Sequence, residues 1–207
     1  MGRMLVGLLI GIVLVPAMAL MYLKYGRPPV AAADAPFPFE KFVTGVPLKA
    51  RIEFEQVTKP PVKSDEDTFV AGAHIYAQEC AVCHGYHGQV SRFGMKMYPT
   101  ATPLWEKHGS GDVVGVSDDP LGETYWKVEN GIRLTGMPGF KGILTPAQMW
   151  QVSMLLANAN KPLPPAALAI LRGDGPAEGS AAQSGTAAAA ALKLPAGSKV
   201  EVSGSPN

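Results

Sequence analysis

The chain has 207 residues, which is enough for one domain of ordinary size with extensions but too few for two large domains. Apolar residues make up 47% of the sequence and the mean hydropathy is +0.10, as expected for a globular body joined to a membrane segment. The formal net charge is only +1, so the chain lacks the strongly basic character typical of nucleic-acid binding. Nucleic acid is therefore not an expected partner.

The N-terminal segment is strongly apolar. Residues 4–23 carry no charged side chain, and 20 residues of helix would be about 30 Å long, matching the core of a bilayer. This predicts a transmembrane anchor within residues 1–27. The alternative is a cleaved signal peptide, with Arg3 as its basic end and Ala17-Met18-Ala19 as its cleavage site. The apolar run continues to Leu23, beyond that site, which favours a retained anchor.

Residues 28–63 are rich in proline and lack helical periodicity, so they are predicted to form a tether. Fully extended, these 36 residues could span about 120 Å. Within them, residues 48–55 alternate strictly between apolar and polar, which predicts either one half-buried strand, lying on the haem domain or on a partner subunit, or an extended charged linker.

A compact helical domain is predicted over residues 64–160. The spacing of Ser64 and Asp67 is that of a capping box, and the helix it opens has four residues on one face: Phe69, Ala73, Tyr76 and Cys80. Residues 85–116 are interrupted by glycine and proline and are predicted to be loop. Two further helices are expected, one from Asp119-Pro120 to Asn130-Gly131 and one opened by Thr145-Pro146 with Gln148.

From residue 161 to residue 207 the composition falls to mainly alanine, glycine, proline and serine. Such a low-complexity tail is predicted to be disordered by itself. One short alternating stretch within it, Lys199–Val202, could add to the edge of a sheet in a partner.

The two cysteines carry the most specific signal. Cys80, Cys83 and His84 form a Cys-x-x-Cys-His sequence, the attachment motif for c-type haem. The two thiols bond to the vinyl groups of the porphyrin, and the adjacent imidazole binds the iron. The sequence therefore predicts one covalent haem c, with His84 as an axial ligand.

Two other uses of the cysteines are weaker. With His87 the motif offers four zinc ligands, but structural zinc sites usually draw their two ligand pairs from separate elements. A thioredoxin-like redox pair needs a βαβ context, which the sequence does not contain.

The second axial ligand is predicted to be Met137, because the loop Thr135-Gly136-Met137-Pro138-Gly139 holds the backbone in a non-helical path. Met95 and Met97 are rivals in the long loop, whereas Met149 and Met154 are expected to be packing residues of the last helix. Ligation by histidine and methionine raises the reduction potential and leaves no open position on the iron.

Residues 69–158 resemble the small monohaem class I cytochromes c of bacterial respiratory chains. The residues that carry the resemblance are Gly72, Tyr76, Cys80, Cys83, His84, Tyr125, Trp126, Asn130, Gly131, Met137, Pro138 and Trp150. The resemblance implies a mainly α fold, namely a small helical domain around one covalent haem, here with an N-terminal transmembrane helix and irregular extensions at both ends.

The resemblance also implies further roles. The first and last helices should cross near Gly72, with Trp150 close to it. A proline carbonyl should orient the ligand imidazole, and Pro103 fits that position better than Pro99. Trp126 is expected to pack on the haem or on a neighbouring helix, as is Tyr76.

The function implied is one-electron transfer as a shuttle or as a subunit of a respiratory or dehydrogenase complex, without enzymatic activity or a small-molecule substrate of its own. Haem attachment of this kind is completed outside the bacterial cytoplasm, which implies an inner-membrane protein with its haem domain in the periplasm. Residues 64–160 carry six basic and ten acidic side chains, a net charge of −4, whereas relatives that dock on oxidases often have lysines around the haem edge. The acidic domain favours a positively charged redox partner or permanent attachment in a complex.

Two alternatives differ in class. A haem enzyme or gas sensor would need a labile sixth ligand, so Met137 would not bind iron and carbon monoxide would bind the reduced protein. A structural subunit would use its tails to hold a larger complex together, with the haem incidental.

Overall fold

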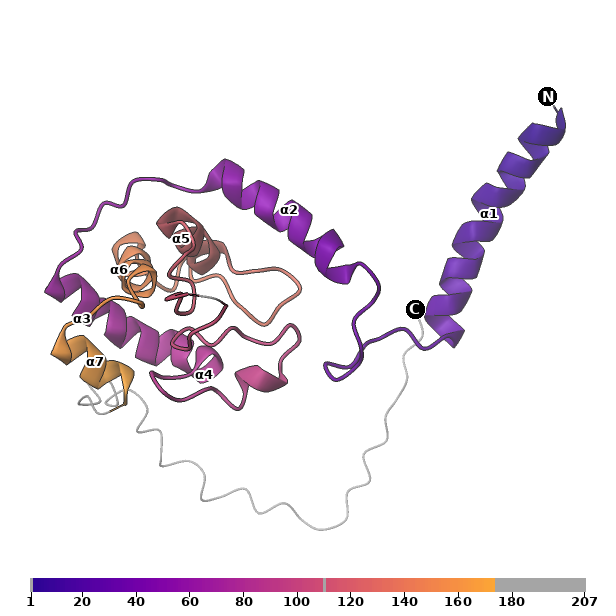
Figure 1. Ribbon diagram of the computed structural model, residues 1–207. Coiled ribbons are helices and arrows are strands. Elements are labelled where there is room, and N and C mark those ends of the chain that lie inside the picture. The colour runs from indigo at the N-terminus through magenta and orange to yellow at the C-terminus, as the bar shows by residue number, and fades with distance from the viewer. Residues whose placement is uncertain (1, 110, 174–207) are drawn as a thin grey trace, which may run out of the picture. The chain divides into compact units, whose positions relative to one another are not determined.

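The computed structural model describes residues 2–109 and 111–173 and is mainly helical (Figure 1). In chain order its elements are α1 (Gly2–Tyr25), α2 (Glu40–Glu55), α3 (Glu66–Ile75), the π-helical turn η1 (Tyr76–Cys80), α4 (Ala81–His84), the 3-10 turn η2 (Gly94–Lys96), α5 (Leu121–Asn130), α6 (Pro146–Ala157) and α7 (Pro165–Leu171). In this part of the chain, β-type pairing is limited to three isolated bridges. The predicted mainly α fold with an N-terminal apolar helix is confirmed.

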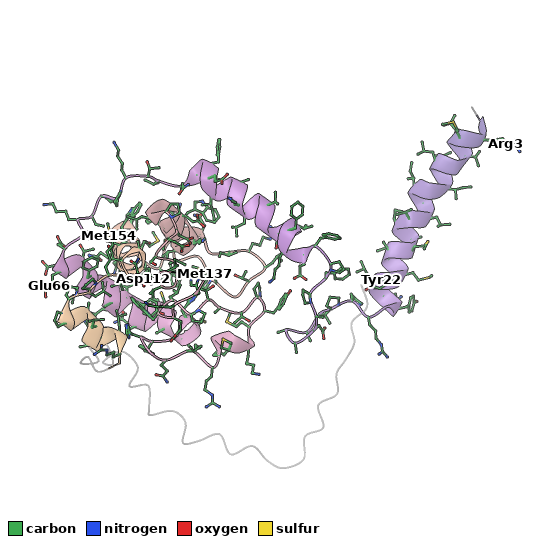
Figure 2. All side chains as sticks on the ribbon, in the orientation of Figure 1. Arg3, Tyr22, Glu66, Asp112, Met137 and Met154 are labelled. Carbon is green, nitrogen blue, oxygen red and sulfur yellow. The ribbon has the colours of Figure 1, made fainter. Side chains whose placement is uncertain are left out.

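Helix α1 contains 24 residues, which makes it about 36 Å long. None of its residues is buried, and its length and composition suffice to cross a bilayer. Arg3 and Tyr22 lie near its two ends (Figure 2). Membrane anchors and N-terminal signal sequences share these properties.

The domain core is built on the crossing of α3 and α6, with α5 packed on α6 and α7 packed on α3. At the crossing, a Cβ on Gly72 would lie 2.6 Å from the Gln151 carbonyl oxygen and 3.1 Å from the Leu155 Cβ. The absence of a side chain at Gly72 thus lets the two helices touch. Gln151 and Leu155 provide the atoms nearest to Gly72, and Trp150, the residue before Gln151, stacks on Tyr125 of α5 with ring centroids 4.0 Å apart. The reason is that Trp150 precedes Gln151 by about 100° of helix turn and so faces α5.

Capping residues set where the helices begin. In α6 the predicted capping box is present, since the Gln148 N–H donates to Thr145 Oγ1 at 3.3 Å and the Thr145 N–H donates to Gln148 Oε1 at 2.9 Å. In α3 the N-cap is Asp65 and not the predicted Ser64, and its carboxylate accepts from the Thr68 N–H at 3.0 Å. A carboxylate is favoured there because it also interacts with the positive end of the helix dipole.

The predicted strand over residues 48–55 is wrong, because these residues form the second half of α2. Alternation over so short a stretch also places Leu48 and Ile52 on one side of a helix, and Ile52 is buried there. Two ion pairs at i,i+4 spacing support the helix: Lys49–Glu53 and Arg51–Glu55.

The predicted boundary at residue 161 is also wrong, because α7 belongs to the domain. Leu163, Ala167 and Leu171 are buried against the core, and the His87 N–H donates to the Leu171 carbonyl at 2.9 Å. These three residues are spaced four apart, as expected for one face of a helix, but the alanine-rich composition of the segment makes that pattern hard to recognise in the sequence. Lys199–Val202 lies outside the described residues, as does the rest of the tail from residue 174.

Candidate cofactor site

The Cys-x-x-Cys-His segment lies where the π-helical turn η1 passes into α4. Both cysteines are free thiols and half-buried, with Cys80 closing η1 and Cys83 one turn later in α4. Burial, followed by the negative charge of Glu79 and interaction with Cys83, raises the pKa of the Cys80 thiol to about 12. Two thiols at one helical turn, with neither tied in a disulfide, form the arrangement that thioether attachment requires.

The segment is held in place by the residues that follow it. Tyr76 is fully buried and donates its hydroxyl to the Gly85 carbonyl at 2.6 Å. Gly85 has φ +82° and its missing side chain admits the Gln89 carbonyl, with which a Cβ would overlap. A short π-helical turn before the motif is typical of functional sites. The chain on both sides of His84 is thereby fixed.

The His84 ring is oriented by one backbone acceptor. Its Nδ1 lies 2.7 Å from the Thr102 carbonyl oxygen, so Nδ1–H is the donor and Nε2 keeps its lone pair. Burial lowers the pKa of His84, opposed by the bond to Thr102. A neutral imidazole with a free Nε2 is the form that binds iron.

The acceptor is Thr102 and not Pro103, so the role that the resemblance implied for the proline carbonyl is wrong by one residue. The residue before a proline is confined to extended conformations, which fixes the direction of its carbonyl group. Pro103 therefore positions the acceptor without being it.

The Met137 loop is pinned by its own hydrogen bonds. The Ile132 N–H donates to the Met137 carbonyl at 3.2 Å, and the Met137 N–H donates to Thr135 Oγ1 at 3.1 Å. The side chain of Met137 is half-buried, and Figure 2 shows it within the helical domain. Met97 reaches the same loop, since a Cβ on Gly136 would overlap the Met97 Cε. Met149 and Met154 are buried on α6 as packing residues.

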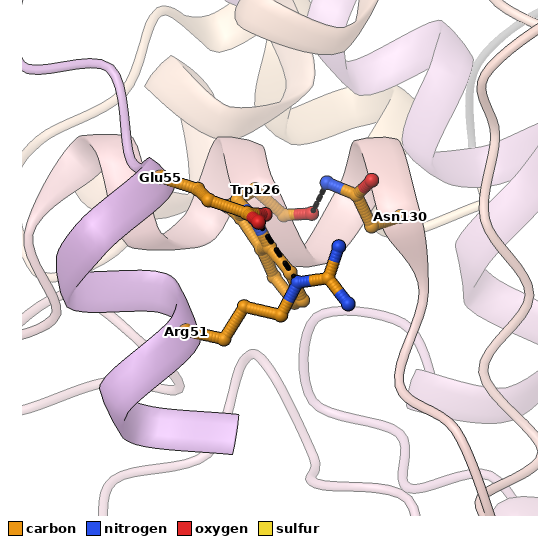
Figure 3. A network of polar contacts seen from close by, with 4 residues as sticks. All are labelled: Arg51, Glu55, Trp126 and Asn130. Atoms are coloured by element: carbon orange, nitrogen blue, oxygen red, sulfur yellow. Dashed lines mark hydrogen bonds and ion pairs between the residues drawn. The ribbon is translucent and has the colours of Figure 1, made fainter. Parts of the chain in front are cut away.

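Trp126 lies at the contact between α5 and α2. Its indole Nε1–H donates to Glu55 Oε2 at 2.9 Å, and Glu55 also accepts from Arg51 Nε at 2.9 Å (Figure 3). Asn130 completes the group by donating to the Trp126 carbonyl at 3.0 Å. The polar edge of Trp126 thus binds a neighbouring helix, which is one of the two predicted roles.

Trp105 is a site residue that sequence reasoning missed. It is 6% exposed, and its ring meets Tyr76 edge to face with centroids 5.4 Å apart. Its Nε1–H is buried and makes no hydrogen bond of ordinary geometry, although Trp105 lies close enough to the Tyr76 hydroxyl to oppose the rise in the pKa of that group. A buried donor without an acceptor fits a cofactor that brings acceptors of its own, and haem carries two propionates. In the sequence, the feature that could have identified Trp105 was its position two residues after Pro103, the proline expected to lie beside the ligand imidazole.

The zinc alternative finds no support in the geometry. Among residues 2–109 and 111–173, no three His, Cys, Asp or Glu side chains come together as a metal site. His87 instead lies against the Trp105 ring, with centroids 6.0 Å apart.

A family model described as "Cytochrome C oxidase, cbb3-type, subunit III" matches residues 67–154. The match covers less than half of the chain but includes the helices from α3 to α5, most of α6, the Cys-x-x-Cys-His segment and Met137. No curated protein and no solved structure matches the chain.

Proposed function

We propose that the protein is a membrane-anchored electron carrier with a single covalent haem c, and the match of residues 67–154 to the cytochrome family model supports this proposal. Cys80 and Cys83 would bind the haem covalently, and His84 and Met137 would be its axial ligands. The haem would supply a one-electron Fe(III)/Fe(II) couple.

The observation that carries the proposal is the hydrogen bond from His84 Nδ1–H to Thr102. It selects the tautomer whose Nε2 is free and restrains rotation of the ring. It also makes Nε2 a stronger electron-pair donor to the iron. Both cysteines lie within four residues of that ring. A free histidine on a surface helix would need no such support.

Met137 is favoured as the sixth ligand because its backbone is fixed before any ligand binds. A pinned loop loses little conformational freedom on ligation and keeps the thioether in place in both oxidation states. With both axial positions filled by the protein, oxygen and other small ligands have no entry, which suits electron transfer.

The proposed location is the bacterial inner membrane, with α1 as a retained anchor and the haem domain in the periplasm. The partner would be a redox protein or a membrane respiratory complex, as a shuttle or as a fixed subunit. The net charge of −4 over residues 64–160 supports a positively charged docking surface on that partner.

Denaturing electrophoresis with haem staining, together with spectra of the native protein, tests the proposal. We expect haem to stay with the polypeptide, and the reduced spectrum to be unchanged by carbon monoxide. Haem that leaves the denatured chain would refute covalent attachment. Retained haem that binds carbon monoxide would instead support a haem enzyme or gas sensor. Intact-mass measurement of the membrane fraction, after alkaline extraction, shows whether residues 1–27 are retained.

A further inference from the structure

The outer side of α2 is apolar and uncovered, and we propose that it lies in the headgroup region of the bilayer. Helix α2 would then be an interfacial helix that holds the haem domain against the membrane. The inference rests on the proposed membrane anchor and goes beyond it, because an anchor alone leaves the domain free to turn.

Helix α2 has two different sides. Four large apolar side chains fall within a sector of about 120° on a helix of 3.6 residues per turn, and this sector also contains Glu53, which pairs with Lys49 at its edge. The four are Phe42, Val43, Val46 and Phe54, which are 69%, 65%, 52% and 91% exposed. Ile52, only 3% exposed, lies on the opposite side and contacts the domain. The apolar sector therefore faces away from the domain.

The helix cannot turn to bury this sector, because the domain holds it at both ends. At its start, Glu40 and Tyr98 line the same surface pocket, and burial and the nearby Glu40 carboxylate together raise the pKa of Tyr98. At its end, Trp126 donates to Glu55 as Figure 3 shows, and the Val57 carbonyl lies so close to Gly122 that a Cβ there would overlap it. Helix α2 is thus part of the cytochrome body.

The segment before α2 indicates what covers the apolar sector. The Phe37 ring meets the Tyr22 ring edge to face, with centroids 6.5 Å apart. Tyr22 lies in the last turn of α1 with Lys24 and Tyr25, and such aromatic and cationic side chains mark the membrane–water interface. Helix α2 begins three residues after Phe37, so its first turn starts at the level of the interface.

The connecting segment is compact, which keeps α2 close to the end of the anchor. The N–H groups of Val30 and Ala31 both donate to Asp34 Oδ2 at 2.8 Å, closing a turn. The apolar side chains are spread from Phe42 to Phe54 along a helix about 24 Å long, and the exposed Lys49–Glu53 ion pair lies between them, as expected of a helix in the interface plane, where charged groups meet the headgroups. A protein partner could cover the same sector, but the Phe37–Tyr22 contact favours lipid.

Photo-crosslinking of the full-length haem protein tests the inference. The crosslinker p-benzoylphenylalanine replaces Phe54 on α2, Val13 in α1, or Ile143, which is 65% exposed on the loop before α6. The proteins are illuminated in vesicles of phosphatidylethanolamine and phosphatidylglycerol, and in isolated cell membranes. We expect lipid adducts at positions 54 and 13 and none at position 143.

The outcomes separate the inference from the proposed function. Lipid adducts at position 13 without adducts at position 54 would overturn the inference and leave the anchor intact. No lipid adduct at either position would overturn both. Adducts of position 54 with a second copy, or with another protein in cell membranes, would replace the bilayer by a protein partner.

A variant adds a second readout. Phe42→Asp combined with Val46→Asp should lower lipid adducts at position 54 by about tenfold, because two carboxylates oppose burial in the interface. Adducts at position 13 and the haem spectrum should not change. An unaltered yield at position 54 would show that the apolar sector does not hold α2 on the bilayer.

Discussion

Met137 and Met97 approach the same short loop, on either side of Gly136. Met137 follows that glycine in sequence, and the methyl group of Met97 contacts it from the long loop. The two thioethers have the same chemistry, so only position can decide which one binds iron. The hydrogen bonds at Thr135 and Ile132 fix the backbone of Met137, which makes it the better-placed ligand.

Met137→Leu should therefore open the sixth position. We expect the reduced variant to bind carbon monoxide and its reduction potential to fall, because a thioether favours the reduced iron. Met97→Leu is the matched control and should leave both properties unchanged. Carbon monoxide difference spectra and redox titration provide the readouts, and the reverse pattern would assign Met97 as the ligand.

At this scale the sequence predicts side-chain chemistry better than backbone chemistry. Cys80, Cys83 and His84 could be assigned from their spacing, because covalent attachment needs those groups in that order. The Thr102 acceptor could not, since every residue has a carbonyl group and loop geometry decides which one points at the ring. The buried N–H of Trp105 likewise depends on tertiary packing.

Helices whose ends carry local signals could be predicted from the sequence. Thr145 and Gln148 cap α6 as expected, and Gly131 ends α5 with φ +69°. Helix α2 was missed because its stability depends on a distant contact, that of Glu55 with Trp126, 71 residues away. Helix α7 could not be predicted because its buried residues lie in an alanine-rich segment. The composition of that segment does not reveal which residues contact the folded core.

The close crossing of α3 and α6 predicts opposite effects for two helical glycines. Gly72→Ala should lower the free energy of unfolding by about 2 kcal/mol, because the added methyl group meets the Gln151 carbonyl. Gly45→Ala in α2 meets nothing within 4 Å and should raise it by about 0.5 kcal/mol. Chemical denaturation followed by circular dichroism measures both, and equal effects would contradict the crossing.

The cap of α3 gives stability a dependence on pH. Hydrogen bonds from Thr68, first that of its side chain and then that of its backbone, lower the pKa of Asp65 in the folded state. The stabilisation is therefore complete above the unfolded pKa of about 3.9 and is lost as pH falls through the folded value.

Asp65→Asn keeps a good N-cap but removes this titration, so its unfolding free energy should fall less steeply below about pH 4. Asp67→Asn is the control, because it removes a carboxylate from the same turn that is not the N-cap. Denaturation series between neutral pH and about pH 3 compare the slopes. Parallel slopes for the wild type and Asp65→Asn would rule out the assigned cap.

Over the whole molecule, charge is divided unevenly along the chain. The domain has a net charge of −4, whereas the complete sequence has +1, so the excess cations lie in the flanking segments. An acidic surface attracts cationic partners, and dissolved salt shortens the distance over which this attraction acts.

The rate of electron transfer should therefore respond to salt according to the charge of the partner. Oxidation of the reduced protein by the cation tris(1,10-phenanthroline)cobalt(III) should slow as ionic strength rises, and oxidation by the anion hexacyanoferrate(III) should accelerate. Stopped-flow measurements over a range of salt concentrations give the two trends. A rate with the cationic oxidant that rises with salt would show that the haem edge is locally basic.

The binding of α2 to the domain also changes how far the haem can travel. The connection shortens from the expected 36 residues to residues 26–39, which could span at most about 50 Å if fully extended and span less with the turn at Asp34 closed. One molecule confined to a half-sphere of that radius has an effective concentration on the order of 5 mM toward a partner in the same membrane. A complex whose dissociation constant is about 5 mM is then half formed. The partner can therefore dissociate quickly while the carrier still spends about half of its time bound.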